Sequence, residues 1–179
     1  MKNIVIKYGL ISGLIASVWM AVTMGLCHNS GSYEGNMLLG FSSMIIAFSL
    51  MFPAVKSYRD KYNGGVISFG KAFQIAFLIA LIGSSMYVVT WVVDYYFFMP
   101  DFMEKLSAQM INKAQQSGKS AAEIAGKIEQ VNSMKNVYSS IFGVIFYTYM
   151  EILPVGIIVA LITALILKRK INNGEVSVA

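Results

Sequence analysis

The chain has 179 residues, of which 56% are hydrophobic and only 13% are charged. A soluble domain carries about a quarter charged residues to keep its surface wetted, so this composition excludes an ordinary soluble protein. The net charge of +5 does not indicate nucleic acid as a partner, because the Lys and Arg residues stand at the ends of apolar segments and form no single basic face. The lone cysteine, Cys27, excludes an internal disulfide and a cysteine-based metal cluster.

The first apolar segment covers residues 8–27, between Lys7 and His28. A helix that crosses the hydrocarbon core needs about 20 apolar residues, because each residue adds about 1.5 Å. The segment is longer than the apolar core of a typical signal peptide, and no small-residue cleavage site follows it. We therefore interpret it as an uncleaved membrane span.

Small residues recur every fourth position along this first span. Such a stripe lets the backbones of two helices approach closely in a membrane, where van der Waals contact drives helix association. It predicts packing inside a compact bundle, which we favour, although the same stripe would also serve as a dimer interface. The residues are Gly9, Gly13, Ser17, Ala21 and Gly25.

The second predicted span covers residues 37–55 and is closed by Pro53 and Lys56. Basic and aromatic residues follow it directly, and basic residues beside a membrane are attracted to anionic headgroups. We expect a membrane-surface loop here, and a docking site for a cytoplasmic partner is the alternative. The residues that would contact the membrane surface are Lys56, Tyr58, Arg59 and Lys61.

A long polar segment separates the third predicted span, residues 72–93, from the fourth, residues 148–167. Apolar residues recur at helical spacing within residues 101–136, and Ser120 with Glu123 forms a capping-box pattern that begins a second helix. The pattern predicts a helical hairpin whose second helix runs on into the fourth span from about residue 137. Its apolar stripes are expected to pack on each other or on the membrane surface.

The distribution of basic residues predicts how the spans are oriented. Short cytoplasmic loops of membrane proteins are enriched in Lys and Arg. With the amino terminus inside, both termini are cytoplasmic, and the hairpin, whose lysines are balanced by acidic residues, is extracytoplasmic. The inner segments then hold Lys2, Lys7, Lys56, Arg59, Lys61, Lys71, Lys168, Arg169 and Lys170.

Glu151 and Asp94 are the candidate functional residues. A carboxylate within a span is costly, so it should face protein or water. The predicted spans place Glu151 about one turn inside the outer interface, using the rise of about 1.5 Å per residue, and Asp94 near the same level. Two such carboxylates would bind a cation or share a proton. The alternative is that both reach headgroup water and bind helix ends or Tyr hydroxyls.

The sequence supports no enzymatic chemistry. His28 is the only histidine, and no metalloprotease, phosphate-loop or nucleophile-elbow motif is present. We therefore expect no bound metal, no cofactor and no catalytic residue.

Two segments resemble an uncharacterised bacterial membrane family, domain of unknown function 4199. The first is Lys56-Ser-Tyr-Arg-Asp-Lys-Tyr-Asn-Gly-Gly-Val-Ile-Ser-Phe69, continued by Gly-Lys-Ala-Phe73. The second is Glu151-Ile-Leu-Pro-Val-Gly156, followed by a small-residue-rich span that ends in Lys168-Arg169-Lys170. The resemblance covers nearly the whole chain and implies a four-span inner-membrane protein of bacteria. It implies no activity, substrate or site residue.

The sequence thus predicts an all-α, polytopic integral membrane protein: one membrane domain over residues 1–179, with a four-transmembrane-helix bundle and an extracytoplasmic hairpin between spans 3 and 4. We expect a non-enzymatic accessory or scaffold subunit of the bacterial inner membrane that acts through contacts of its helices and hairpin. The alternative is a small dimeric transporter, coupled to cations or protons through Glu151. The expected partners are membrane lipids and either a second copy or another membrane protein.

Overall fold

The computed structural model describes residues 1–31, 33 and 37–169, and these residues are almost entirely helical. Parts of two sequence predictions, residues 34–36 of the first outer connection and Lys170 of the basic stop, lie outside this range. The helices in chain order are α1 (Lys2–Ser30), α2 (Met37–Ser49), α3 (Met51–Tyr62), α4 (Phe69–Val93), the π-helical turn η1 (Asp94–Phe98), α5 (Phe102–Gln116), α6 (Ala121–Tyr138) and α7 (Ile141–Leu167).

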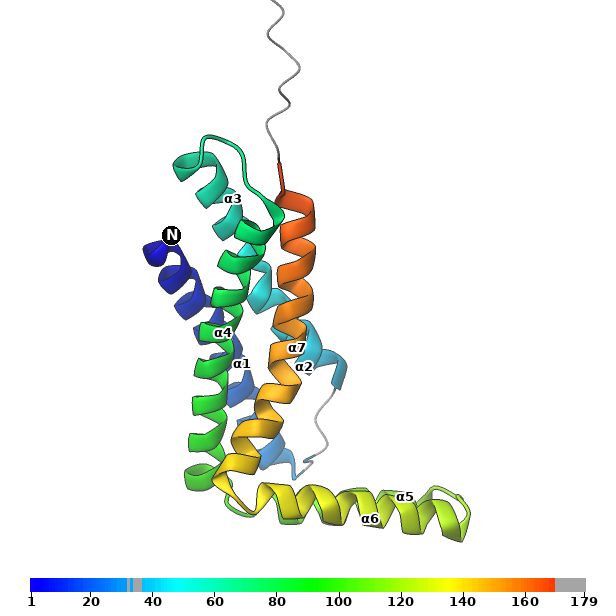
Figure 1. Ribbon diagram of the computed structural model, residues 1–179. Helices are drawn as coiled ribbons and strands as arrows, with labels where there is room; N and C mark the ends of the chain where they lie inside the picture. Colours follow the sequence, from blue (N-terminus) through cyan, green and yellow to red (C-terminus); the bar gives the residue numbers. More distant parts are fainter. Residues whose placement is uncertain (32, 34–36, 170–179) are drawn as a thin grey trace, which may run out of the picture.

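Four helical segments of the described chain are long and apolar enough to cross a membrane: Lys2–Ser30, Leu38–Tyr62, Phe69–Phe98 and Ile141–Leu167. The amino terminus and the end of α7 lie at one end of this bundle, and α5 and α6 lie at the other (Figure 1). We call these the terminal end and the hairpin end. The predicted all-α fold is confirmed, with four helices of the length and apolar composition that membrane spans require.

The second span is broken at Leu50, between α2 and α3. Pro53 lies in the first turn of α3, where its missing N–H cannot bond the carbonyl of Ser49, so the chain turns here and then continues as a helix. Lys56 and Lys61 therefore lie on α3, and the expectation of a loop at these residues was wrong. The connection to α4 is shorter than the loop that the sequence suggested, because it begins only at Asn63.

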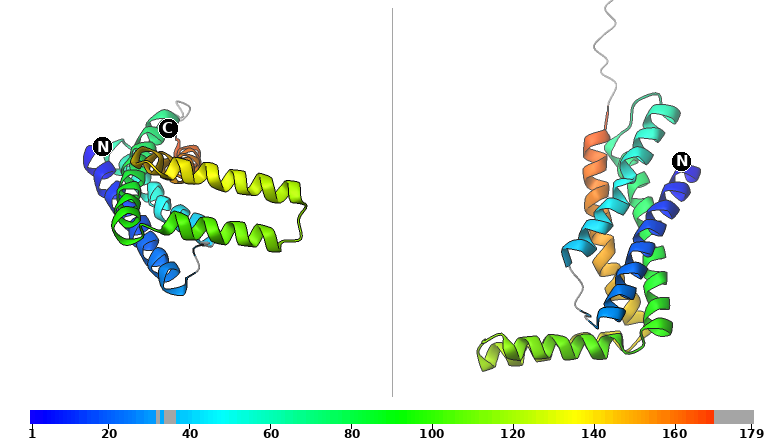
Figure 2. Two further views of the ribbon diagram at one scale, coloured as in Figure 1. Left: turned by 90° about the horizontal axis from the view of Figure 1, so that it is seen from below. Right: turned by 180° about the vertical axis from the view of Figure 1, so that it is seen from behind.

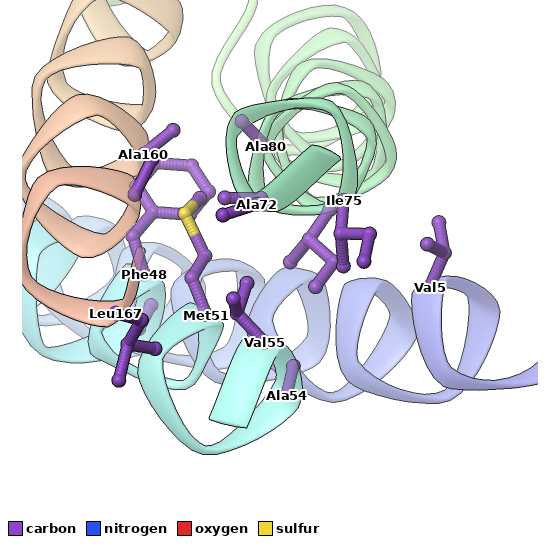
Figure 3. Packing of buried hydrophobic residues seen from close by; sticks show 14 of the residues in the cluster. Val5, Phe48, Met51, Ala54, Val55, Ala72, Ile75, Ala80, Ala160 and Leu167 are labelled. Atoms are coloured by element: carbon purple, nitrogen blue, oxygen red, sulfur yellow. The ribbon is translucent and has the colours of Figure 1, made fainter. Parts of the chain in front are cut away.

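Phe48 is the central side chain of the bundle core. It comes from α2, is fully buried, and lies against Gly83 of α4 and Gly156 of α7. A Cβ added to either glycine would approach the Phe48 ring to 3.1 or 3.2 Å, so the two glycines provide the space for the ring. Figure 3 shows Phe48 beside Met51, with the small side chains of α4 and α7 around them. Three spans thus meet around one aromatic ring.

The stripe of small residues on α1 has two parts in the structure. Gly9 and Gly13 lie against α4, where an added Cβ would meet the Cβ atoms of Ile82 at 2.8 Å and Met86 at 2.9 Å. At Gly25, in contrast, an added Cβ would have no atom within 4 Å, and Ala21 lies beside the same open space. The first half of α1 therefore packs closely on α4, and its last turns diverge from it.

Helices α5 and α6 form the predicted hairpin, which projects sideways from the bundle (Figures 1 and 2). Ser120 and Glu123 form the predicted capping box at the start of α6. The base of the hairpin is held by Phe102, whose ring contacts Trp91 at 5.0 Å and Tyr33 at 5.8 Å between centroids. The connection after α1 adds a hydrogen bond from the Tyr33 N–H to the Gln109 side chain, at 2.9 Å.

Helix α6 does not run on into the fourth span, so that expectation was wrong. It ends at Tyr138, and α7 begins at Ile141 after a cap in which Ser140 accepts a hydrogen bond from the Gly143 N–H. The chain turns sharply here, since an added Cβ at Gly143 would collide with the carbonyl of Val137. A single straight helix could not both lie across the end of the bundle and enter it.

We expect Gly13→Leu to destabilise the bundle by about 1–3 kcal/mol, the usual cost of overpacking, because the added side chain would collide with Met86. Gly25→Leu is the matched control on the same helix and should cost less than about 0.5 kcal/mol, as expected for a substitution at an open position. Unfolding of each variant in mixed micelles, followed by circular dichroism, would measure the difference. Equal costs at the two positions would contradict the close α1–α4 contact.

Candidate functional site

Arg59, at the terminal end of the bundle, binds the protein itself. The Arg59 guanidinium donates to Asp60 Oδ1 at 2.7 Å and to the carbonyl of Leu167, the last residue of α7, at 3.3 Å. Arg59 therefore satisfies the last carbonyl of α7, which no further helical turn can do.

The segment after Arg59 adds further hydrogen bonds that hold α3 and the start of α4 to the end of α7. Asn63 donates its side-chain amide to the Val66 carbonyl at 2.6 Å, and Gly64 and Gly65 adopt φ of 62° and 80°. Ile67 then exchanges both backbone hydrogen bonds with Arg169, just beyond α7. The polar residues of this segment thus have a structural role that joins α3, α4 and α7. Lys56 and Lys61 remain exposed for contact with a membrane surface.

Asp94 and Glu151 have separate surroundings. Asp94 begins η1 at the hairpin end of the bundle, where its Oδ2 atom is buried beside the end of α1. Glu151 lies within α7, and its side chain is exposed on the outside of the bundle. No hydrogen bond or ion pair joins the two carboxylates among the residues that the structure describes.

Glu151 lies deeper in its span than the sequence suggested. Helix α7 already begins at Ile141, so Glu151 lies about 15 Å along it at the rise of 1.5 Å per residue. The whole helix has 27 residues and is about 40 Å long, against a hydrocarbon core of about 30 Å. Glu151 is therefore about 10 Å inside the hydrocarbon core if the helix is centred in it.

The surroundings of Glu151 on α7 are apolar and aromatic. Tyr147, one turn earlier, is 42% exposed, and Ile158, two turns later, is 57% exposed. The Tyr147 ring contacts the Tyr138 ring. Burial, and to a smaller extent the charge of Glu151, raises the pKa of the Tyr138 phenol. Pro154, which has no N–H, leaves the Met150 carbonyl without its usual helical donor on this part of α7.

This arrangement is unfavourable in lipid alone. Lipid tails offer no donor for a carboxylate, and a charged side chain at the centre of a span costs about 2.5–3.5 kcal/mol even on the insertion scale that gives the lowest values. Within the described chain no hydrogen bond or ion pair offsets this cost for Glu151. The geometry therefore marks the Glu151 side of α7 as a place where a donor from outside this bundle would be strongly favoured.

The fold defines the class of this protein: it is an all-α bundle with four helices long and apolar enough to cross a membrane and a helical hairpin before the last of them. The chain belongs to the family described as protein of unknown function, DUF4199, whose model matches residues 7–169. No curated protein and no solved structure matches the chain. The family thus agrees with the resemblance seen in the sequence and assigns no activity to Glu151 or Asp94.

We expect Glu151→Leu to stabilise the isolated monomer by about 1–3 kcal/mol, since the substitution removes a carboxylate that lipid cannot solvate. Ile158→Leu, at an exposed apolar position on the same side of α7, is the control and should be neutral. Unfolding of the dilute, monomeric protein in bicelles would measure both. A loss of stability in Glu151→Leu would show that the carboxylate is paired within the chain.

Proposed function

We propose that this chain is a non-enzymatic accessory or scaffold subunit of the bacterial inner membrane, which holds another membrane protein against α7. The exposed carboxylate of Glu151 carries this proposal, because a membrane partner with a hydrogen-bond donor or a basic group would offset its cost. The Tyr147 hydroxyl and the Met150 carbonyl offer further polar atoms to the same partner. Exposed apolar side chains such as Ile158 and Ile162 would supply the surrounding contact.

The proposed orientation places the terminal end of the bundle in the cytoplasm. The basic residues of α1, α3 and the end of α7 gather there, as the positive-inside rule requires. The hairpin is then extracytoplasmic, and because it projects sideways from the spans it runs along the membrane surface (Figure 2). A partner that sits against the spans would meet this hairpin as a second contact.

The alternative function is a small dimeric transporter, coupled to cations or protons. The observation that favours it is the same carboxylate: two copies joined through α7 would bring two Glu151 side chains together, and such a pair shares a proton readily. In this arrangement the donor for each carboxylate comes from the second copy. Scaffold and transporter therefore differ in the identity of the neighbour on α7.

In-membrane photo-crosslinking distinguishes the two functions. With p-benzoylphenylalanine at Ile158 or Ile162, we expect a crosslink to a different membrane protein, identified by mass spectrometry, that is reduced at least fivefold by Glu151→Leu. The matched control is Phe146, which is 61% exposed but lies about 140° around α7 from Glu151 at 3.6 residues per turn. It should give no such crosslink.

A crosslink only between two copies would contradict the scaffold function and support the dimer. The transporter would then require that Glu151→Gln abolish pH-driven cation uptake by the purified chain in proteoliposomes. Equal crosslinking at Phe146 and Ile158, unaffected by Glu151→Leu, would contradict both functions.

The orientation is tested by labelling Cys27, the only cysteine of the chain and a free thiol near the hairpin end of α1. A maleimide that cannot cross membranes should label Cys27 in intact spheroplasts, because the proposed topology places this residue near the outer face. A Cys27→Ser variant with a cysteine at Lys61 is the matched control and should be labelled only after the membrane is opened. The reverse pattern would show that the hairpin is cytoplasmic.

A further inference from the structure

A partly open cavity of about 310 Å³ lies at the hairpin end of the bundle, between the last turns of α1 and the turn η1 that follows α4. It is separate from the exposed side of α7 that carries the proposed function, since none of its lining residues comes from α7. Its walls are mainly apolar and include Met24, Phe98 and Met99, and its polar groups belong to His28 and Asp94.

Two local features keep this space open. Gly25 faces it without a side chain, and an added Cβ there would meet no atom within 4 Å. On the other wall, α4 widens into the π-helical turn η1, in which the Met99 N–H bonds the Asp94 carbonyl at 2.8 Å. Such turns are often found at functional sites, because the wider helix redirects a side chain. Here the turn begins at the carboxylate that lines the cavity.

Asp94 is the group in this cavity that lacks a partner. Its Oδ2 atom is buried and accepts no hydrogen bond from any residue that the structure describes. His28, the other polar side chain of the cavity, has a partner of its own, since its Nδ1 atom lies 3.4 Å from the Tyr33 hydroxyl. A buried carboxylate oxygen without a donor is costly, and a ligand that donates a hydrogen bond would remove this cost.

The shape and chemistry of the cavity select the kind of ligand. A carboxylate accepts hydrogen bonds and carries a negative charge, which favours a cation with N–H donors over an anion. A hard metal ion such as Mg²⁺ or Ca²⁺ requires six or more oxygen ligands, whereas the described walls offer one carboxylate and one imidazole among thioethers and an aromatic ring. The remaining volume and the Phe98 ring suit an apolar chain attached to that cation.

We propose that this cavity binds a primary alkylammonium group, with its nitrogen against Asp94 and its apolar chain along Met24, Phe98 and Met99. Two sources supply this chemistry at the proposed outer surface: the headgroup of phosphatidylethanolamine and a free amphiphilic amine. This site does not depend on the scaffold function, because it involves neither Glu151 nor a second membrane protein. It assigns a ligand-binding role to the end of the small-residue stripe that does not pack on α4.

The test is a titration of the full chain in detergent with octylamine, and with octanol as the uncharged analogue of the same length. Thermal unfolding should shift upward and saturate with octylamine. Asp94→Asn, which is close in size, should weaken octylamine binding about tenfold, the loss expected for one charge-assisted hydrogen bond, and should leave octanol unchanged. Asp101→Asn is the matched control, since this carboxylate is near the hairpin base but binds Lys105 outside the cavity.

Gly25→Leu provides a second, independent variant, because it fills the cavity without removing a charge. It should abolish the response to octylamine while the unliganded protein keeps its helical content. Octylamine binding that is equal in the wild type, Asp94→Asn and Gly25→Leu would overturn the proposal. It would also be overturned if neither octylamine nor phosphatidylethanolamine bound saturably to the wild type. Asp94→Asn keeps the test decisive if Gly25→Leu does not fold.

Native mass spectrometry then separates the two sources of the ammonium group. Retention of dioleoyl phosphatidylethanolamine but not dioleoyl phosphatidylglycerol, lost in both variants, would support the site and identify a lipid headgroup. Saturable binding of octylamine without retention of phosphatidylethanolamine would support the site with a free amine as its ligand. Equal retention of the two lipids by the wild type and both variants, together with no octylamine response, would contradict it.

Discussion

The structure depends on one constraint: the interior of a bilayer supplies neither hydrogen bonds nor solvation for charge. Every backbone group within a span must therefore be bonded inside the chain, which leaves helices as the available structure for these apolar segments. The same constraint moves charged side chains to the helix ends, where Arg59 satisfies the end of α7 and Lys56 and Lys61 stay exposed. Glu151 is the exception, and for that reason it carries the functional argument.

Because lipid is as apolar as the side chains, the four spans associate through close packing rather than through burial from water. Gly9 and Gly13 allow α1 to approach α4, and Gly83 and Gly156 provide the space for Phe48. Where this packing stops, at the last turns of α1, the helices separate and leave the cavity at Asp94. The two proposed sites thus lie where the bundle does not complete its own packing: the outer side of α7 and the space beside Gly25.

Much of the fold was predictable because its signals are local. The uncharged stretches set the spans, and the Ser120–Glu123 capping box marked the start of α6. The errors arose where a local signal was correct but the path of the chain after it depended on the tertiary structure. Pro53 does interrupt the second span, yet the helix resumes after it, since the first turn of a helix tolerates proline. The residues near 137 do favour a helix, but α6 lies across the end of the bundle, so the chain must turn before α7.

The sequence by itself determined that this protein has four helices suited to cross a membrane, that a hairpin precedes the last of them, and that Glu151 and Asp94 are its unusual carboxylates, because charge and hydropathy act over a few neighbouring residues. Only the tertiary structure decided that Glu151 is exposed and that Asp94 shares a cavity with His28 and Gly25. Those facts depend on which side of each helix faces its neighbours. That choice is made by packing between residues far apart in the chain, which no local pattern encodes.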